Sequence, residues 1–218
     1  MALTKVRGSG LGTLGDGTAS DTAIVFDGNA QNFHIGLDDS ADSLILGLGS
    51  TLGTTSHMVI DASGHITKPL QSAFSVECGT AHTNISTGST TIIMDTERFD
   101  QNGDFNTSNY TFTAPVTGRY QFSWAVQFAD VGGQDQVSGS TYLSAVCNTS
   151  NIDYEVYFDF AIGDKTTDSH TICGSALADM DANDTAHIHI YNNMQSTTGD
   201  IMGDSSQMTT YFTGYLVC

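Results

Sequence analysis

Short stretches in which apolar and polar residues alternate are the feature that most constrains the fold of this chain. In RYQFSWAVQF the side chains of Tyr120, Phe122, Trp124 and Val126 fall on one face of an extended strand. The segments AHIHIY and TTYFTGYLV repeat this alternation nearer the C-terminus. A period of two residues, with no helical period anywhere, predicts an all-β protein.

The alternation predicts a series of strands from Ala73 to the C-terminus. The expected strands lie at 73–77, 91–95, 109–113, 118–128, 140–147, 153–161, 170–178, 185–192 and 207–217. Gly, with 23 residues, is abundant, whereas Pro occurs only twice, so tight turns between short strands are expected. This density of strands is typical of a β-sandwich or jelly roll.

The N-terminal part carries a separate series of apolar bursts between turn residues. They are TAIVFDG (22–28), NFHIGLDD (32–39), DSLILGLG (42–49) and HMVIDASGHITK (57–68), and DASGH around Gly64 has the chemistry of a hairpin or β-solenoid corner. No burst is long enough to bury itself, so residues 21–70 are predicted to form a β-rich oligomerising stem, with a floppy linker as the alternative. Residues 1–20 are predicted to be a flexible attachment segment. KPLQSAF (68–74) is the expected junction to a head at 71–218.

The charge of the chain excludes several classes of partner. The formal net charge is −18, with only six Lys and Arg residues. Phosphate recognition needs clustered basic residues, so nucleic acid and anionic membranes are not expected partners. No apolar run has the roughly 18 residues that a membrane span needs. Lys5 and Arg7 have no apolar run behind them, so no secretory leader is expected.

The segment FDQNGDFNTSNYTFTAPVTGRYQFSW (99–124) carries a spaced set of aromatic and turn residues. The set resembles the signature of the C1q globular-head family, and the matching positions are Asp100, Phe105, Phe112, Gly118, Tyr120 and Phe122, with Trp124 at the closing position. Two positions depart from the family pattern, because Met94 stands where a Phe is usual and Trp124 where a Phe or Tyr closes it. Both substitutes are bulky and apolar, so we expect the packing to be kept.

The resemblance implies a jelly-roll sandwich of the architecture shared by C1q and tumour necrosis factor ligands, with the signature aromatics in its core. It also implies a compact homotrimer with a stem leading into the heads. The N-terminal stretch GDGTASDTAIVFDGNAQNFHIGLDDSADSLILGLGS is similar to a module of structural proteins of marine bacteriophages.

Two Asp-rich loops are candidate calcium sites. Their oxygen-bearing residues recur every second position, Asp100, Asn102 and Asp104 in one loop and Asp179, Asp181 and Asn183 in the other. Neither loop has the Gly and Glu of an EF-hand, and solvated turns are the alternative interpretation. The resemblance implies calcium near the trimer apex in some members of the family. No cofactor is expected to be required.

Other reactive residues give no pattern of a catalytic site. His187 and His189 share one face of a strand, which two metal ligands can use, but ordinary surface or inter-strand histidines are the favoured interpretation. No catalytic motif for nucleophilic, metalloprotease or nucleotide chemistry is present, so no enzyme is expected. The four cysteines at 78, 147, 173 and 218 are expected to be buried free thiols, although three disulfide pairings are open.

Together these features favour a virion structural appendage of a bacteriophage. It would be a short homotrimeric fibre on the tail or a decoration on the capsid, exposed on a particle assembled in the host cytoplasm. Lys5 and Arg7 would dock on other virion proteins, and the head would adhere to a host-surface glycan or protein, gaining affinity by multivalency. The alternative is a secreted C1q-like lectin or recognition protein. An enzyme acting on surface glycans would need paired carboxylates that the sequence cannot locate.

Overall fold

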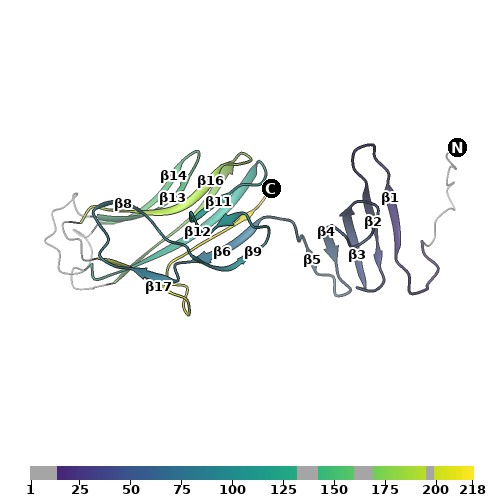
Figure 1. The fold of residues 1–218 in the computed structure, drawn as a ribbon, viewed down its shortest axis with the longest axis horizontal. Coiled ribbons are helices and arrows are strands. Elements are labelled where there is room, and N and C mark those ends of the chain that lie inside the picture. Colours follow the sequence, from purple (N-terminus) through teal and green to yellow (C-terminus); the bar gives the residue numbers. More distant parts are fainter. Residues whose placement is uncertain (1–13, 132–141, 160–168, 195–198) are drawn as a thin grey trace. The chain divides into compact units, whose positions relative to one another are not determined.

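The chain is built from β-strands throughout its described parts. The computed structural model describes residues 14–131, 142–159, 169–194 and 199–218, and every regular element in them is a strand. The all-β prediction is therefore confirmed. These ranges contain no helix with the length and apolar character of a membrane span. The chain divides into two compact units, residues 1–71 and 72–218 (Figure 1).

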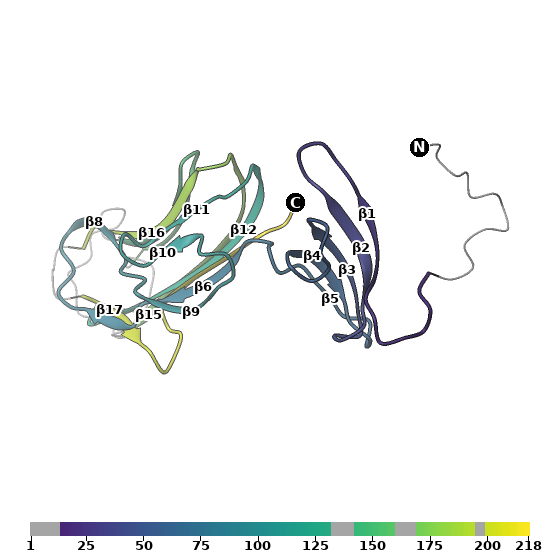
Figure 2. The same ribbon diagram turned by 45° about the vertical axis from the view of Figure 1, so that its right-hand side comes forward.

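The N-terminal unit, called the stem here, is a single antiparallel sheet in which each strand pairs with the next (Figure 2). Its strands are β1 (Thr22–Phe26), β2 (Phe33–Asp38), β3 (Ser43–Leu48), β4 (Ser56–Ile60) and β5 (Ile66–Thr67). The turn around Gly64 is a hairpin between β4 and β5, closed by a 2.9 Å hydrogen bond from the Gly64 amide to the Asp61 carbonyl. Gly64 has a φ of 86°, which explains glycine there.

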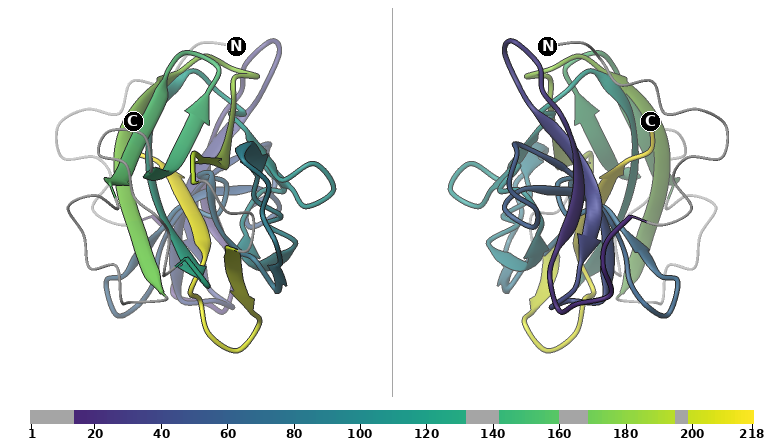
Figure 3. Two further views of the ribbon diagram at one scale, coloured as in Figure 1. Left: turned by 90° about the vertical axis from the view of Figure 1, so that its left-hand side faces the viewer. Right: turned by 90° about the vertical axis from the view of Figure 1, so that its right-hand side faces the viewer.

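The C-terminal unit, called the head, is a sandwich of two antiparallel sheets (Figure 3). The six-stranded sheet has the order β10 (Phe105–Asn106), β11 (Thr111–Thr113), β16 (Thr185–Asn192), β13 (Tyr142–Thr149) and β14 (Asp153–Asp159), with β8 (Gly88–Thr91) also paired to β16. The seven-stranded sheet has the order β7 (Thr80–His82), β17 (Asp200–Asp204), β12 (Gly118–Ala129), β18 (Tyr211–Leu216), β6 (Ala73–Glu77) and β9 (Thr96–Asp100), with β15 (His170–Met180) also paired to β12. The predicted jelly-roll sandwich is confirmed.

The strand predicted at 91–95 is wrong for a physical reason. Ile92 and Met94 are both fully buried, so the alternation is real. The Ile92 amide, however, donates to the Ile188 carbonyl of the six-stranded sheet at 3.0 Å, whereas β9 pairs with β6 in the other sheet. The segment therefore crosses from one sheet to the other. Strands β7, β8, β9, β10 and β17 were not predicted, because none of them is longer than five residues.

The core of the head lies between the two sheets, along the inward face of β12. Tyr120, Phe122 and Trp124 are completely or almost completely buried. Phe122 packs against Phe212 with ring centroids 5.3 Å apart. Gly174 pairs with Trp124, and a Cβ at that position would overlap the indole ring, so the large residue requires the small one.

Candidate functional site

The residues of the aromatic signature are structural elements of the head. The signature aromatics at 105, 112, 120, 122 and 124 are all buried. The Asp100 carboxylate accepts hydrogen bonds from the amides of Gly103 and Asp104, both at 3.1 Å, and from Phe105 at 2.8 Å. Asp100 thereby closes the turn that places Phe105 in the core. Sequence and packing agree that these residues build the sandwich.

Gly118 begins β12 at a point of close approach. A Cβ on Gly118 would lie 2.6 Å from the Cys218 carbonyl oxygen, so only glycine fits beside the C-terminal strand. Two residues further on, the Tyr120 hydroxyl donates to the Val116 carbonyl at 2.8 Å. That bond satisfies the polar end of a tyrosine whose ring is in the core.

In the first Asp-rich loop, the candidate calcium-binding oxygens of Asp100 accept hydrogen bonds from the backbone. Both carboxylate oxygens of Asp100 accept amide hydrogens, Asn102 is exposed, and Asp104 is half-buried. In the second loop, Asp179 pairs with Arg119, and Asp181 accepts a hydrogen bond from the Thr117 hydroxyl. Asn183 has a φ of 75°, consistent with a turn.

Neither loop brings a third carboxylate into a ligand cluster. Across residues 14–131, 142–159, 169–194 and 199–218, no group of three His, Cys, Asp or Glu side chains is placed to hold a metal ion. Calcium at either loop, which would also draw on amide and carbonyl oxygens, stays a prediction.

His187 and His189 project from the same outer face of β16, with ring centroids 5.8 Å apart. Burial lowers the pKa of both imidazoles, although Asp153 on β14 opposes the shift at each. Both rings are therefore neutral near pH 7. Metal binding by this pair stays a prediction.

The cysteine prediction holds for two of the four residues. All four thiols are free; Cys78 and Cys147 are buried, as expected, whereas Cys173 and Cys218 are exposed. Cys173 lies on an outward-facing position of β15, and Cys218 is the terminal residue. The expectation of burial is wrong for both. Lys5 and Arg7, the predicted docking residues, lie outside the described residues.

One face of the stem sheet is apolar and exposed. Register places these side chains opposite one another across neighbouring strands: Ile24 faces Ile35, which faces Leu46, and Phe26 faces Phe33. The apolar stem face, as we call it, consists of exposed Ile24, Phe26, Phe33, Ile35, Leu37, Leu44, Leu46 and Ile66. It carries no charged side chain, although the chain is strongly acidic. Contiguous apolar patches of this extent mark interaction sites.

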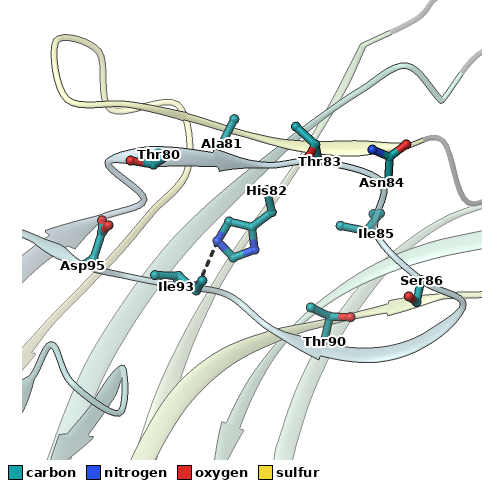
Figure 4. A pocket seen from close by; sticks show the side chains of 10 residues that line it. All are labelled: Thr80, Ala81, His82, Thr83, Asn84, Ile85, Ser86, Thr90, Ile93 and Asp95. Atoms are coloured by element: carbon teal, nitrogen blue, oxygen red, sulfur yellow. Dashed lines mark hydrogen bonds between the residues drawn. The ribbon is translucent and has the colours of Figure 1, made fainter.

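The head contains a cavity of about 420 Å³ with both polar and apolar lining residues, formed where the segment between β6 and β9 folds over itself (Figure 4). Its lining is Thr80, Ala81, His82, Thr83, Asn84, Ile85, Ser86, Thr90, Ile93 and Asp95. The volume lies within the range of about 300–1,000 Å³ that is usual for small-ligand sites. No lining residue is Lys or Arg.

The His82 ring lies inside this cavity, as Figure 4 shows. Its Nε2 is 3.3 Å from the Ile93 amide nitrogen, which must be the donor, so Nε2 accepts and the proton lies on Nδ1. Burial lowers the pKa of His82, with Asp95 opposing the shift. The neutral ring thus offers Nδ1–H as a hydrogen-bond donor.

Side chains from distant parts of the head fix the cavity wall. Asn192, almost fully buried, donates to the carbonyls of Ile85 and Ser86 at 3.1 and 3.2 Å. The Asp200 carboxylate accepts from the Asn84 amide at 2.7 Å. These bonds join residues more than 100 positions apart. No local pattern in the sequence therefore predicted the cavity.

A second hollow, of about 320 Å³, lies on the outer face of the six-stranded sheet. Tyr142, Tyr157 and Glu155 contribute to its lining. Tyr142 contacts Tyr157 edge-on at 6.2 Å and stacks on Tyr191 at 5.9 Å between ring centroids. This is a group of exposed and half-buried aromatics on an otherwise polar surface.

The two antiparallel sheets of the head define the class of the domain, a β-jelly-roll sandwich. Residues 73–217 match the family model of the C1q domain, and this chain belongs to the C1q-domain family. Domains of this family are typically recognition or binding modules. The match covers the head and not the stem, so the bacteriophage resemblance of the N-terminal part stays a hypothesis.

Solved structures with a similar fold come from the C1q and tumour necrosis factor groups. The globular domain of zebrafish complement 1qA is 18% identical, with 68% of this chain and 98% of that chain covered and a TM-score of 0.48. Murine APRIL at pH 8.5 is 9% identical, with coverages of 67% and 99% and a TM-score of 0.46. Eiger TNF from S. frugiperda is 8% identical, with coverages of 68% and 94% and a TM-score of 0.45. No curated protein matches the chain.

Proposed function

We propose that this protein is a non-enzymatic, homotrimeric appendage of a bacteriophage virion whose C1q head recognises the host surface. The family of the head supports the recognition part of the proposal. The observation that carries the assembly is the apolar stem face, which a single copy of the chain leaves in contact with water. No Lys, Arg, Asp or Glu lies among the residues of that face.

Other copies of the same chain are the partners that best fit the apolar stem face. Two acidic chains of charge −18 repel one another, and an uncharged contact surface allows approach with the smallest electrostatic cost. Three sheets packed with these faces inward would form a closed apolar core, as stacked β-elements commonly do. Homotrimers among C1q and tumour necrosis factor homologues support the same stoichiometry.

A trimer would convert weak contacts of single heads into firm attachment. Three heads on one stem, repeated over a particle, raise the effective concentration of binding sites at the host surface. Residues 1–20, with Lys5 and Arg7, would join the trimer to other virion proteins on the tail or the capsid. In this arrangement the acidic heads face outward from the particle.

The test is to purify phage particles from a lysate of infected cells whose phage carries the gene. The particles are then searched for this chain by mass spectrometry and by antibody labelling in electron microscopy. We expect the chain in the particles, at a copy number divisible by three. Its recovery only from the secreted fraction, absent from particles, would overturn the virion assignment. That outcome would favour the second candidate, a secreted C1q-like lectin or recognition protein, which the family of the head supports equally.

A further inference from the structure

We propose that the cavity around His82 binds a neutral, hydroxyl-rich ligand, a carbohydrate unit, and is the ligand contact of the head. The inference rests on the proposed recognition function and adds the place and the ligand class. It follows from the hydrogen-bonding groups of the lining, the absence of basic side chains there and the fixed position of the wall.

The lining presents groups that match sugar hydroxyls in both directions. Four hydroxyl side chains line the cavity, those of Thr80, Thr83, Ser86 and Thr90, and none of them is engaged in a hydrogen bond with another residue of the described chain. Each can donate and accept, as a sugar hydroxyl can. The side-chain amide of Asn84 adds two donors and an acceptor.

The remaining lining residues add a donor, an acceptor and an apolar surface. His82 offers its Nδ1–H, while Asp95 accepts from the Gly79 amide at 2.8 Å and has further acceptor capacity. Ile93, which is 37% exposed, supplies apolar contact for the carbon-bound hydrogens of a sugar ring. A few convergent polar groups on an apolar base are the usual composition of a small-molecule site.

The electrostatics disfavour the main alternative, an anionic ligand. The lining holds one carboxylate and no basic side chain, and the whole chain carries a charge of −18. Sulfated, phosphorylated or sialylated ligands would meet like charge with no compensating cation. A neutral hexose or N-acetylhexosamine meets no such barrier.

The wall is fixed before a ligand arrives. Asn192 holds the Ile85 and Ser86 carbonyls, Asp200 holds the Asn84 amide, and Gly199 accepts from the Ile85 amide at 2.8 Å. A ligand therefore does not have to order this loop, which reduces the entropic cost of binding. Hydrogen bonds that hold the wall in place distinguish this cavity from an accidental hollow at the surface.

The experiment uses the full chain and ligand-observed saturation-transfer NMR. The probes are glucose, galactose, mannose and N-acetylglucosamine, with sialic acid as the anionic comparison. The blocking variant is Thr83→Trp, at an exposed lining position, and the matched control is Thr91→Trp, exposed nearby but outside the lining. Urea unfolding followed by far-ultraviolet circular dichroism checks that both variants fold, because each variant adds a second tryptophan to Trp124.

We expect at least one neutral sugar to bind, with affinity at least tenfold lower in Thr83→Trp and unchanged in Thr91→Trp. The inference is overturned if no neutral sugar binds, if sialic acid binds instead, or if the folded Thr83→Trp variant binds as the parent does. These results are separable from the fate of the proposed function. A chain found on particles that binds no neutral sugar overturns only the cavity inference, whereas a sugar-binding chain absent from particles overturns only the virion role.

Discussion

The stem sheet and the head use the same alternation of apolar and polar residues and differ in what covers the apolar side. On β2 and β3 of the stem, Ile35 and Leu46 are 37% and 41% exposed. On β12 of the head, Tyr120 and Phe122 are completely buried at equivalent alternating positions. In the head a second sheet of the same chain covers the apolar face.

Alternation therefore predicts a strand with an apolar face, but it does not predict what covers that face. A lone sheet buries its apolar face only against a second layer. The head has both layers within residues 72–218. The described stem has one layer, so its missing layer is the one that we assign to other copies of the chain. Four experiments test this difference between the stem and the head.

The largest expected effect is on the free energy of unfolding of the head after Phe122→Ala. Removing a fully buried ring should cost about 3–5 kcal/mol, because a cavity remains among Phe74, Phe112 and Phe212. Urea unfolding followed by Trp124, the single tryptophan of the chain, reports on the head alone. The matched stem variant Phe33→Ala should leave that transition unchanged. Equal losses in both variants would contradict two independent units.

The next effect is on oligomer mass. The double variant Ile35→Asp with Leu46→Asp places charges on the apolar stem face, and we expect the mass from light scattering to fall from three times 23.1 kDa toward 23.1 kDa. The control is Val25→Asp, at an exposed position on the opposite face of the same sheet. A variant that remained trimeric would show that the stem face is not needed for assembly.

A smaller effect is expected from acid. The folded pKa values of His82, His187 and His189 are lowered by burial, whereas an unfolded histidine titrates near its ordinary value of about 6.5. Below pH 6.5 the unfolded chain therefore binds more protons, and the free energy of unfolding falls as pH drops through the folded pKa values. Urea midpoints at pH 7.5 and 5.5, read from Trp124, measure this. The variant His187→Asn with His189→Asn should flatten the dependence, and a midpoint that rises on acidification would refute it.

The smallest effect is a difference in thiol reactivity within the head. Burial raises the pKa of Cys78 to about 11 and that of Cys147 to about 12, so neither forms thiolate at neutral pH. Exposed Cys173 and Cys218 should react with a thiol reagent in the native protein. Mass spectrometry should find two labels per native chain and four after denaturation. Four rapid labels in the native state would mean that the sandwich interior is open.

Much of the head could be predicted because its information is local. The spacing from Asp100 to Trp124 identified the family, since each position has a structural role within its own turn or strand. Asp100 closes a turn, Gly118 permits a close approach, and the aromatics fill one face of β12. The prediction of a strand at 91–95 was wrong because this segment crosses between the two sheets. Alternation does not show which sheet a segment joins.

The cavity could not be predicted, because its parts meet only after folding. His82 and Ile93 are 11 residues apart, but Asn84 depends on Asp200 and Ile85 on Asn192, which lie over 100 residues away. The exposure of Cys173 was missed for a related reason, since it follows from an outward position on β15 beside Ala125 of β12.

By itself, the sequence determined the strands, the two regions, the acidic character and the family of the head, because a strand has a fixed two-residue period and turns have fixed residue preferences. The tertiary structure alone decided which apolar faces are covered and which polar residues gather around a cavity. Those outcomes depend on pairings between segments far apart in the chain, which neither period nor composition encodes.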